Sequence, residues 1–259
     1  MIIGVIKDLL QKNGVIKGDT ICVFSDITSF GVPNTLKDHI KKRGMNYLLD
    51  SYIDTFKDVV GKEGILLMPT FTYSACNNEI FDVNNSKSTV GVLTEYFRKK
   101  EDVKRSLHPI FSFAAYGKKA DEILKQEDWD SFSEKSVMGK LENINAMYIL
   151  FGVGMHESAT FVLYSEQKYK AYYRYFKNFP GIIVDGDKKV ETDVSYYVRD
   201  LNINYEYSWE NLEKIGKKRG IIKSDKFESG EIMLMRAKEI DFLIREELDR
   251  DKDSLIRRV

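Results

Sequence analysis

The sequence predicts an α/β fold built on a mixed central sheet. Short apolar stretches alternate with segments of helical periodicity up to about residue 165. Two of the apolar stretches, Ile65–Met68 and Tyr148–Phe151, are continuous, as in strands that are covered on both faces. A hairpin signal around Asp185-Gly186 then adds antiparallel strands in the C-terminal half. We therefore expect one domain spanning residues 1–259.

Composition excludes several classes of protein. The 259 residues can bury a substantial core, and 40 lysines and arginines balance 40 aspartates and glutamates. This balance gives no support for a nucleic-acid partner, and no apolar stretch is long enough to cross a bilayer. The N-terminus lacks the layout of a signal peptide, and Cys22 and Cys76 lack the spacing of metal ligands. We expect a cytoplasmic protein without a metal and without a membrane partner.

The first sixty residues predict two helices around one strand. Residues 2–12 place apolar side chains on one side of a helix that Gly14 ends, and Thr20–Phe24 is a short β-rich stretch. Ile27–Arg43 is mostly polar and predicts a loop with one helical turn. Met45–Val60 has helical periodicity again.

Hydroxyl side chains follow the apolar stretch Ile65–Met68, which ends at Pro69. In α/β folds the carboxyl ends of strands commonly face a ligand. Hydroxyls there donate and accept hydrogen bonds without carrying charge; they belong to Thr70, Thr72, Tyr73 and Ser74. The alternative is a polar loop that binds nothing.

The remaining elements follow from the same patterns. Helices are predicted at Val90–Lys100, 118–127, from Ser136, at Asn211–Lys218 and at Arg236–Arg250. Strands are predicted at Ile110–Tyr116, Tyr148–Phe151, Gly220–Lys223 and Glu231–Met235.

The stretch from Tyr148 to Glu166 combines a buried strand, a turn at Gly152 and Gly154, and a helix that begins near Ser158 or Thr160. A helix N-terminus presents free backbone N–H groups, which favour anionic or carbonyl oxygens. The alternative is an ordinary strand–turn–helix crossover without a ligand.

Several segments together resemble the aminoglycoside 3-N-acetyltransferase family. They occur in the family's order: FSDITSFG from Phe24, GILLMPTFTYS from Gly64, VGVLTEYFR from Val90, RSLHPIFSFAAYG from Arg105, FSEKSVMGKL from Phe132, and the stretch Gly152–Glu166. The resemblance implies a three-layer α/β/α fold. It also implies transfer of an acetyl group from acetyl-CoA to an amino group on a sugar, so that the expected partners are small-molecule substrates.

One position departs from the family's pattern of threonine, two residues, histidine, two residues, glutamate. Thr160 and Glu166 match, but Leu163 stands where the histidine belongs. The resemblance implies that this histidine helps to deprotonate the amine, so the usual base is absent. Glu166, one turn from Leu163, or His156 near the helix start is expected to take its place.

The resemblance also implies contacts to the acyl donor. The thioester oxygen needs hydrogen-bond donors, for which we expect the helix start at Thr160 and the hydroxyls of Thr70 or Thr72. The other expected contacts to CoA are Ser25, Tyr73, Ser106 and Ser112, with Arg105, Lys118 and Lys119 as candidates for its phosphates. His108 is expected either in the wall around the acyl donor or as a hydrogen-bonded structural residue.

The aromatic and basic segment Tyr172–Lys177 bears on the acceptor. Tyr173, Arg174 and Lys177 predict a nucleotide-linked amino sugar, as in surface-polysaccharide biosynthesis, because arginine binds phosphate and tyrosine stacks on bases. The alternatives are an aminoglycoside acceptor, a catalytically impaired relative that only binds CoA or a nucleotide sugar, another acyl group, and charges that simply face solvent. Aromatic surfaces of this kind also occur between subunits, so a homo-oligomer is possible.

Overall fold

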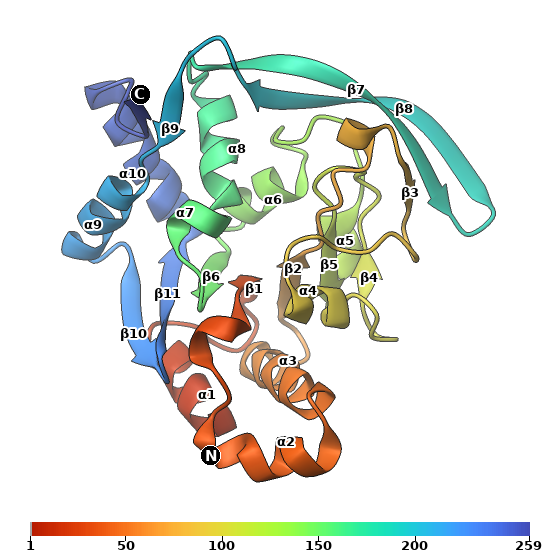
Figure 1. Ribbon diagram of the computed structural model, residues 1–259, viewed down its shortest axis with the longest axis vertical. Helices are drawn as coiled ribbons and strands as arrows, with labels where there is room; N and C mark the ends of the chain where they lie inside the picture. Colours follow the sequence, from red (N-terminus) through yellow and green to blue (C-terminus); the bar gives the residue numbers. More distant parts are fainter. Residues whose placement is uncertain (1) are drawn as a thin grey trace.

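The computed structural model describes residues 2–259, and a mixed seven-stranded sheet lies at its centre (Figure 1). The strand order is β10-β11-β6-β1-β2-β5-β4. β1 pairs in parallel with both β2 and β6, whereas β5 and β11 run antiparallel to their neighbours. The strands are β1 (Thr20–Ser25), β2 (Ile65–Pro69), β4 (Lys104–Arg105), β5 (Phe113–Tyr116), β6 (Met147–Phe151), β10 (Lys223–Phe227) and β11 (Gly230–Arg236).

Alternate side chains of the central strands enter two different cores. Cys22 and Phe24 belong to one buried cluster, while Ile21 and Val23 belong to the other. The second cluster includes side chains of α1 (Ile2–Lys12), α3 (Asn46–Val60) and α4 (Val92–Phe97). The first includes side chains of α5 (Ala120–Leu124), α6 (Val137–Asn143), α8 (Thr160–Lys168), α9 (Glu210–Lys218) and α10 (Ala237–Arg250). Helices therefore cover both faces, which confirms the three-layer α/β/α fold with a mixed sheet.

A long hairpin extends along one side of the molecule, away from the main sheet (Figure 1). Its strands are β7 (Arg174–Asp185) and β8 (Lys188–Arg199), and β3 (Ile80–Asp82) pairs in parallel with β7. Gly186, in the turn, has a φ of 59°. The predicted hairpin around Asp185-Gly186 is confirmed. A separate two-stranded sheet joins β9 (Tyr205–Tyr207) to β12 (Ile256–Arg258).

The structure differs from the sequence-based expectation in Ile27–Arg43. This segment holds two 3₁₀ turns, η1 (Ile27–Phe30) and η2 (Asn34–Leu36), followed by α2 (Lys37–Arg43). Ile27, Phe30 and Leu36 are buried, so three scattered apolar residues hold the polar segment against the core. A further 3₁₀ turn, η3 (Ala75–Asn77), follows β2, and a short helix, α7 (Met155–Ser158), precedes α8.

The expected strand Ile110–Tyr116 is regular only from Phe113. The carbonyl of Ile110 instead accepts the backbone N–H of Thr72, so the first part of this segment holds the loop after β2. Nowhere in residues 2–259 does a helix combine the length and apolar character that a membrane crossing needs.

Candidate active site

A cleft of about 510 Å³ opens where β1, β2 and β6 end. This is the edge of a parallel sheet at which α/β proteins commonly bind ligands. The lining comes from four segments: Phe24–Thr28 after β1, Pro69–Tyr73 after β2, Thr89–Leu93 at the start of α4, and Val153–Thr160 after β6.

Two polar side chains stand at the end of β1. Ser25 lines the cleft, and its Oγ is buried without a hydrogen-bond partner among the described residues. A buried hydroxyl of this kind normally has a partner, so the cleft offers an unused polar atom. Oδ1 of Asp26 accepts hydrogen bonds from the N–H (3.0 Å) and Oγ1 (2.6 Å) of Thr28. These bonds hold the Asp26 carboxylate at the mouth of the cleft.

The turn after β6 requires glycine at its first position. Gly152 has a φ of 75°, and a Cβ there would lie 2.3 Å from Oγ of Ser29. The chain then enters α7 and α8, so that Glu157 and Thr160 line the cleft. A Cβ on Gly154 would lie 2.5 Å from Oε2 of Glu157, which shows that this carboxylate folds back over the turn.

Tyr73 lies in the loop that follows β2. Its φ of 56° lies in the left-handed region, which a bulky residue rarely adopts and which occurs often at functional sites. Its ring packs edge-on against Phe111, with 5.5 Å between ring centres. Burial raises the pKa of Tyr73, so the phenol stays neutral and able to donate a hydrogen bond.

The charge of the cleft is negative. Its lining contains the carboxylates of Asp26 and Glu157 together with hydroxyls of Ser25, Thr28, Tyr73, Thr89, Ser158 and Thr160. Of the residues that the structure describes, no lysine, arginine or histidine lines it. The cleft is therefore suited to a cationic or neutral ligand. The hydroxyl side chains of the lining can form hydrogen bonds with carbonyl and hydroxyl groups of such a ligand.

A family model described as aminoglycoside 3-N-acetyltransferase matches residues 41–246. The chain belongs to this family. Over 207 residues it is 28% identical to the SPbeta prophage-derived aminoglycoside N(3′)-acetyltransferase-like protein YokD of Bacillus subtilis, a match that covers 71% of each chain. The family consists of N-acetyltransferases, so the predicted reaction class, with acetyl-CoA as acyl donor, is confirmed.

Solved structures show the same fold. The chain superposes on aminoglycoside acetyltransferase AAC(3)-IVa, a mutant in complex with a gentamicin, with a TM-score of 0.77, 23% identity and coverage of 97% of this chain and 90% of that one. The binary complex of AAC-IIIb with CoASH gives a TM-score of 0.77 at 17% identity and covers 96% of each chain. At these identities the likeness is one of fold.

Several residues expected to contact CoA lie outside the cleft and form hydrogen bonds between neighbouring strands. Thr70 and Ser112 are fully buried, and the Thr70 carbonyl accepts hydrogen bonds from Ser112 Oγ (2.7 Å) and Arg105 Nη2 (2.6 Å). Oγ1 of Thr72 donates to the Pro109 carbonyl, and Oγ of Ser106 accepts the Phe113 N–H. These hydroxyls join the ends of β2, β4 and β5, which corrects their assignment to the cleft. Ser25, Tyr73 and Thr160 do line it.

His108 lies outside the lining of the cleft. It is buried, and its Nδ1 accepts the backbone N–H groups of Phe111 (3.0 Å) and Ile110 (3.3 Å). Nε2 therefore carries the proton in the neutral ring. Burial lowers the pKa of His108 to about 3. Nε2 is buried without a hydrogen-bond partner among the described residues, so both expectations for His108 stay predictions.

Glu166 lies in the interior, not in the cleft. Its Oε2 is 2.6 Å from Arg174 Nε, and its Oε1 accepts a hydrogen bond from the Tyr173 hydroxyl (2.9 Å). Burial raises the pKa of Glu166, and the Arg174 guanidinium limits that rise. The pair fixes α8 to the start of β7. Glu166, Tyr173 and Arg174 are all buried and partnered within the protein, and none of them lines the cleft, so their expected roles stay predictions.

The other expected residues also lie outside the lining of the cleft. His156 is exposed on α7 and meets Trp209 edge-on, with 6.3 Å between ring centres. Leu163 is half-buried and packs against the core of α8 and α10. Lys177 is exposed on β7, 4.9 Å from the ring centre of Phe179.

Sequence reasoning missed Asp26 and Glu157 as candidate site residues. Asp26 follows a predicted strand directly, and Glu157 follows the glycine turn after another. The carboxyl ends of parallel neighbours meet at one edge, so the two acids could have been paired by the same rule that located the cleft.

Proposed function

We propose that this protein transfers the acetyl group of acetyl-CoA to a primary amine of a cationic amino sugar held in the cleft. The observation that carries the proposal is the lining, in which the only charged groups among the described residues are the carboxylates of Asp26 and Glu157. Aminoglycosides are polycations, and carboxylates are their natural partners. The AAC(3)-IVa structure in complex with a gentamicin supports the same class of acceptor.

A nucleotide-linked amino sugar fits this cleft poorly. The phosphate-binding role expected of Arg174 would require it to leave a buried ion pair with Glu166, and Tyr173 donates its hydroxyl to the same carboxylate. A diphosphate in the cleft would lie near Asp26 and Glu157, where like charges repel. The aminoglycoside alternative is therefore the better supported one.

The chemistry needs a proton acceptor and a donor to the thioester oxygen. A positioned base contributes about 10²–10⁴-fold, and Leu163 cannot act as one. We assign the first proton of the ammonium group to Glu157, directly or through one water, because Glu157 is one of the two acidic residues that line the cleft. The free amine then attacks the carbonyl carbon of the thioester. As the nitrogen–carbon bond forms, Ser25 Oγ and the first N–H groups of α8 donate to the oxygen of the tetrahedral intermediate. The carbon–sulfur bond then breaks, and the CoA thiolate leaves and takes up the proton that the nitrogen loses.

Acceptor assays test this proposal. Release of the CoA thiol is followed with acetyl-CoA and either a kanamycin-type aminoglycoside or a uridine-diphosphate-linked amino sugar. We expect turnover with the aminoglycoside, and Asp26→Asn and Glu157→Gln each to raise its KM by up to about fivefold, since the exposed charge contact that is lost contributes about 0–1 kcal/mol. Glu157→Gln should also lower kcat.

Glu63→Gln is the matched control, because Glu63 is an exposed acid outside the cleft that pairs only with Lys118, at 3.5 Å, among the described residues. Its KM and kcat should equal those of the wild type. Turnover confined to the nucleotide-linked sugar would overturn the proposal.

A further inference from the structure

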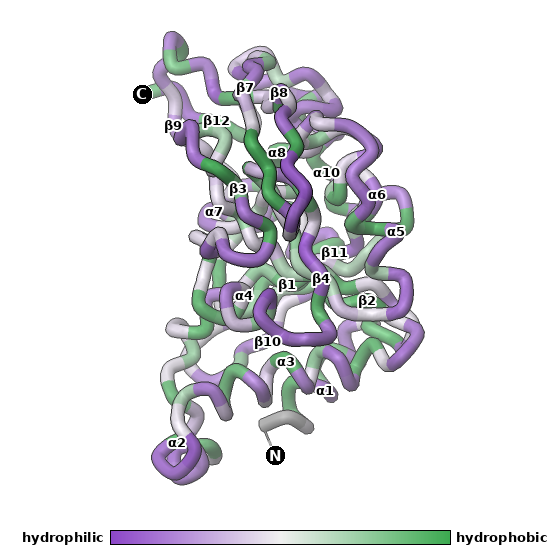
Figure 2. Tube along the Cα trace, turned by 90° about the vertical axis from the view of Figure 1, so that its right-hand side faces the viewer, coloured by the Kyte–Doolittle hydropathy of each residue, from purple (hydrophilic) through white to green (hydrophobic). Residues whose placement is uncertain are grey.

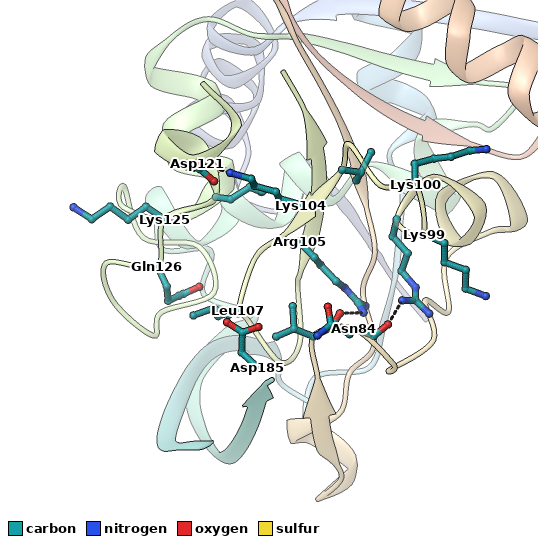
Figure 3. Close-up of a pocket in the computed structure, with 14 residues that line it drawn as sticks. Asn84, Lys99, Lys100, Lys104, Arg105, Leu107, Asp121, Lys125, Gln126 and Asp185 are labelled. Carbon is teal, nitrogen blue, oxygen red and sulfur yellow. Dashed lines mark hydrogen bonds and ion pairs between the residues drawn. The ribbon is translucent and has the colours of Figure 1, made fainter. Parts of the chain in front are cut away.

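A second cavity, of about 830 Å³, lies between α4, β4 and α5 and shares no lining residue with the cleft (Figure 3). The chain from α4 to β4 is mostly hydrophilic there (Figure 2). Cations dominate the lining: Arg98, Lys99, Lys100, Lys104, Arg105 and Lys125, against the acids Asp121 and Asp185. Since the whole chain has no net charge, this is a local concentration of positive charge. We call this cavity the basic groove.

Arg105 is fixed at the base of the groove without a carboxylate partner among the described residues. Nη1 donates to the carbonyls of Val83 (3.1 Å) and Ser86 (2.6 Å), and Nη2 donates to the carbonyl of Thr70. The second N–H of Nη2 has no acceptor within residues 2–259. Burial, followed by the nearby charge of Arg98, lowers the pKa of Arg105 to about 10. The guanidinium is thus held by carbonyl and hydroxyl groups and by the ring of Phe81, 4.9 Å away, and no carboxylate pairs with its positive charge among the described residues.

Two of the lysines in the groove, Lys104 and Lys125, are held loosely, whereas Lys99 and Lys100 pair with Glu95 and Asp50. Lys104 pairs with Asp121 at 2.5 Å, but the two side chains are 62% and 70% exposed. Figure 3 shows the Lys104 ammonium turned toward Asp121 at the rim. Lys125 is exposed and forms no ion pair in the part of the chain that the structure describes. Exposed pairs contribute about 0–1 kcal/mol, so a ligand with more than one negative charge can compete for these lysines.

The groove also has an apolar side. Val83, Val103, Leu107 and Leu124 line it beside the cations. A ligand that combines phosphate groups with a ring or base would therefore satisfy both parts of the lining, whereas a simple inorganic ion would leave the apolar part uncovered.

We propose that the basic groove is a second ligand site, which binds a small molecule carrying two or more phosphate groups and an organic ring. Two sources share this chemistry: the nucleotide end of the acyl donor, and a separate nucleotide. The first source rests on the proposed function, and the second does not. Direct binding measurements separate the proposal from the acceptor assays, because they require no turnover.

Calorimetric titrations of the full-length protein with CoA, ATP and pantetheine test the proposal. The variant Lys104→Gln with Lys125→Gln removes two exposed charges from the groove. Lys41→Gln with Lys42→Gln is the matched control, since both lysines are exposed on α2 and line no part of the groove. We expect the groove variant to bind the phosphate-bearing ligand at least about tenfold more weakly, and the control to bind it as the wild type does.

The titrations with CoA, ATP and pantetheine distinguish the two sources of the ligand. If the groove holds the acyl donor, the groove variant weakens CoA binding, leaves pantetheine binding unchanged, and ATP competes with CoA. If it holds a separate nucleotide, ATP binds to the CoA-saturated protein and the variant weakens only ATP binding. Equal affinities of the wild type, the groove variant and the control for both CoA and ATP would overturn the proposal.

Discussion

Glu166→Gln separates a structural role of this residue from a catalytic one. In the structure, Glu166 and Arg174 form an ion pair whose side chains are 0% and 2% exposed, at 2.6 Å. The substitution keeps the shape and the Tyr173 contact but removes the negative charge. Arg174 is then left as a buried cation that no carboxylate neutralises.

The expected cost is large because the pair is buried. Breaking a buried ion pair by removing one partner costs about 3–5 kcal/mol, through the charge that is left behind. For a protein of this size, each kcal/mol lowers Tm by about 2–4 °C, so Glu166→Gln should lower Tm by roughly 6–20 °C. Replacing both partners with apolar residues, Glu166→Leu with Arg174→Met, should recover part of that loss.

Thermal unfolding and steady-state kinetics are measured on the same preparations, at a temperature where the variant is folded. Glu206→Gln is the control, because Glu206 forms an exposed ion pair with Arg257 at 2.7 Å. It should change the free energy of unfolding by no more than about 1 kcal/mol. For Glu166→Gln we expect a kcat within a few-fold of the wild type.

The opposite pattern would refute this reasoning. A general base contributes about 10²–10⁴-fold to the rate. If Glu166→Gln retains the wild-type Tm while kcat falls by that factor, the carboxylate reaches the substrate in solution and the buried ion pair does not describe its role.

Three further substitutions test the cleft and its surroundings. Ser25→Ala should leave Tm unchanged and lower kcat/KM about tenfold, because the Ser25 hydroxyl has no partner among the described residues; a lower Tm with full activity would contradict this. Leu163→His should leave kcat and the pH–rate profile unchanged, because Leu163 lies outside the lining of the cleft; a rise in kcat of about 10²-fold with an acidic limb near pH 6.5 would show that position 163 reaches the amine. His108 has a pKa of about 3 in the folded state and about 6.5 when unfolded, so the unfolded state binds more protons below pH 6.5 and stability falls as the pH falls. Denaturant unfolding at pH 6.5 and 5 should show a loss of about 2 kcal/mol in the wild type that His108→Asn lacks; equal losses in both would refute it.

The position of the cleft could be predicted because continuous apolar stretches indicate central strands, and ligands commonly bind at the carboxyl ends of such strands. Ile65–Met68 and Tyr148–Phe151 are apolar without alternation, which is typical of strands covered on both faces, and both became central strands. Their carboxyl ends then had to meet at one edge of the sheet. Tyr73 was predicted on this basis, and Ser25 and Thr160 were expected through the family resemblance; all three line the cleft.

The same rule could not tell which polar side chains face a ligand. Thr70 and Ser112 are 42 residues apart, and their contact decides that both point into the protein. The aromatic and basic residues around Arg174 are likewise typical of a phosphate site, but Glu166 on the preceding helix neutralises the guanidinium of Arg174. Pairings of this kind depend on tertiary structure, so composition and spacing overestimate the number of residues available to substrate.

The net charge of the chain likewise does not predict the charge of its individual cavities. The chain balances 40 basic against 40 acidic residues, yet the cleft and the basic groove have opposite character. The cleft at the sheet edge has two carboxylates, and the groove beside β4 has six cations against two acids. At physiological salt, charges are screened beyond about 8 Å. The charges that line a cavity therefore decide which ligand it attracts, whatever the net charge of the whole molecule. An acyl transfer that joins a phosphorylated donor to a cationic acceptor needs such a separation, because a single cavity of either sign would repel one of the two substrates.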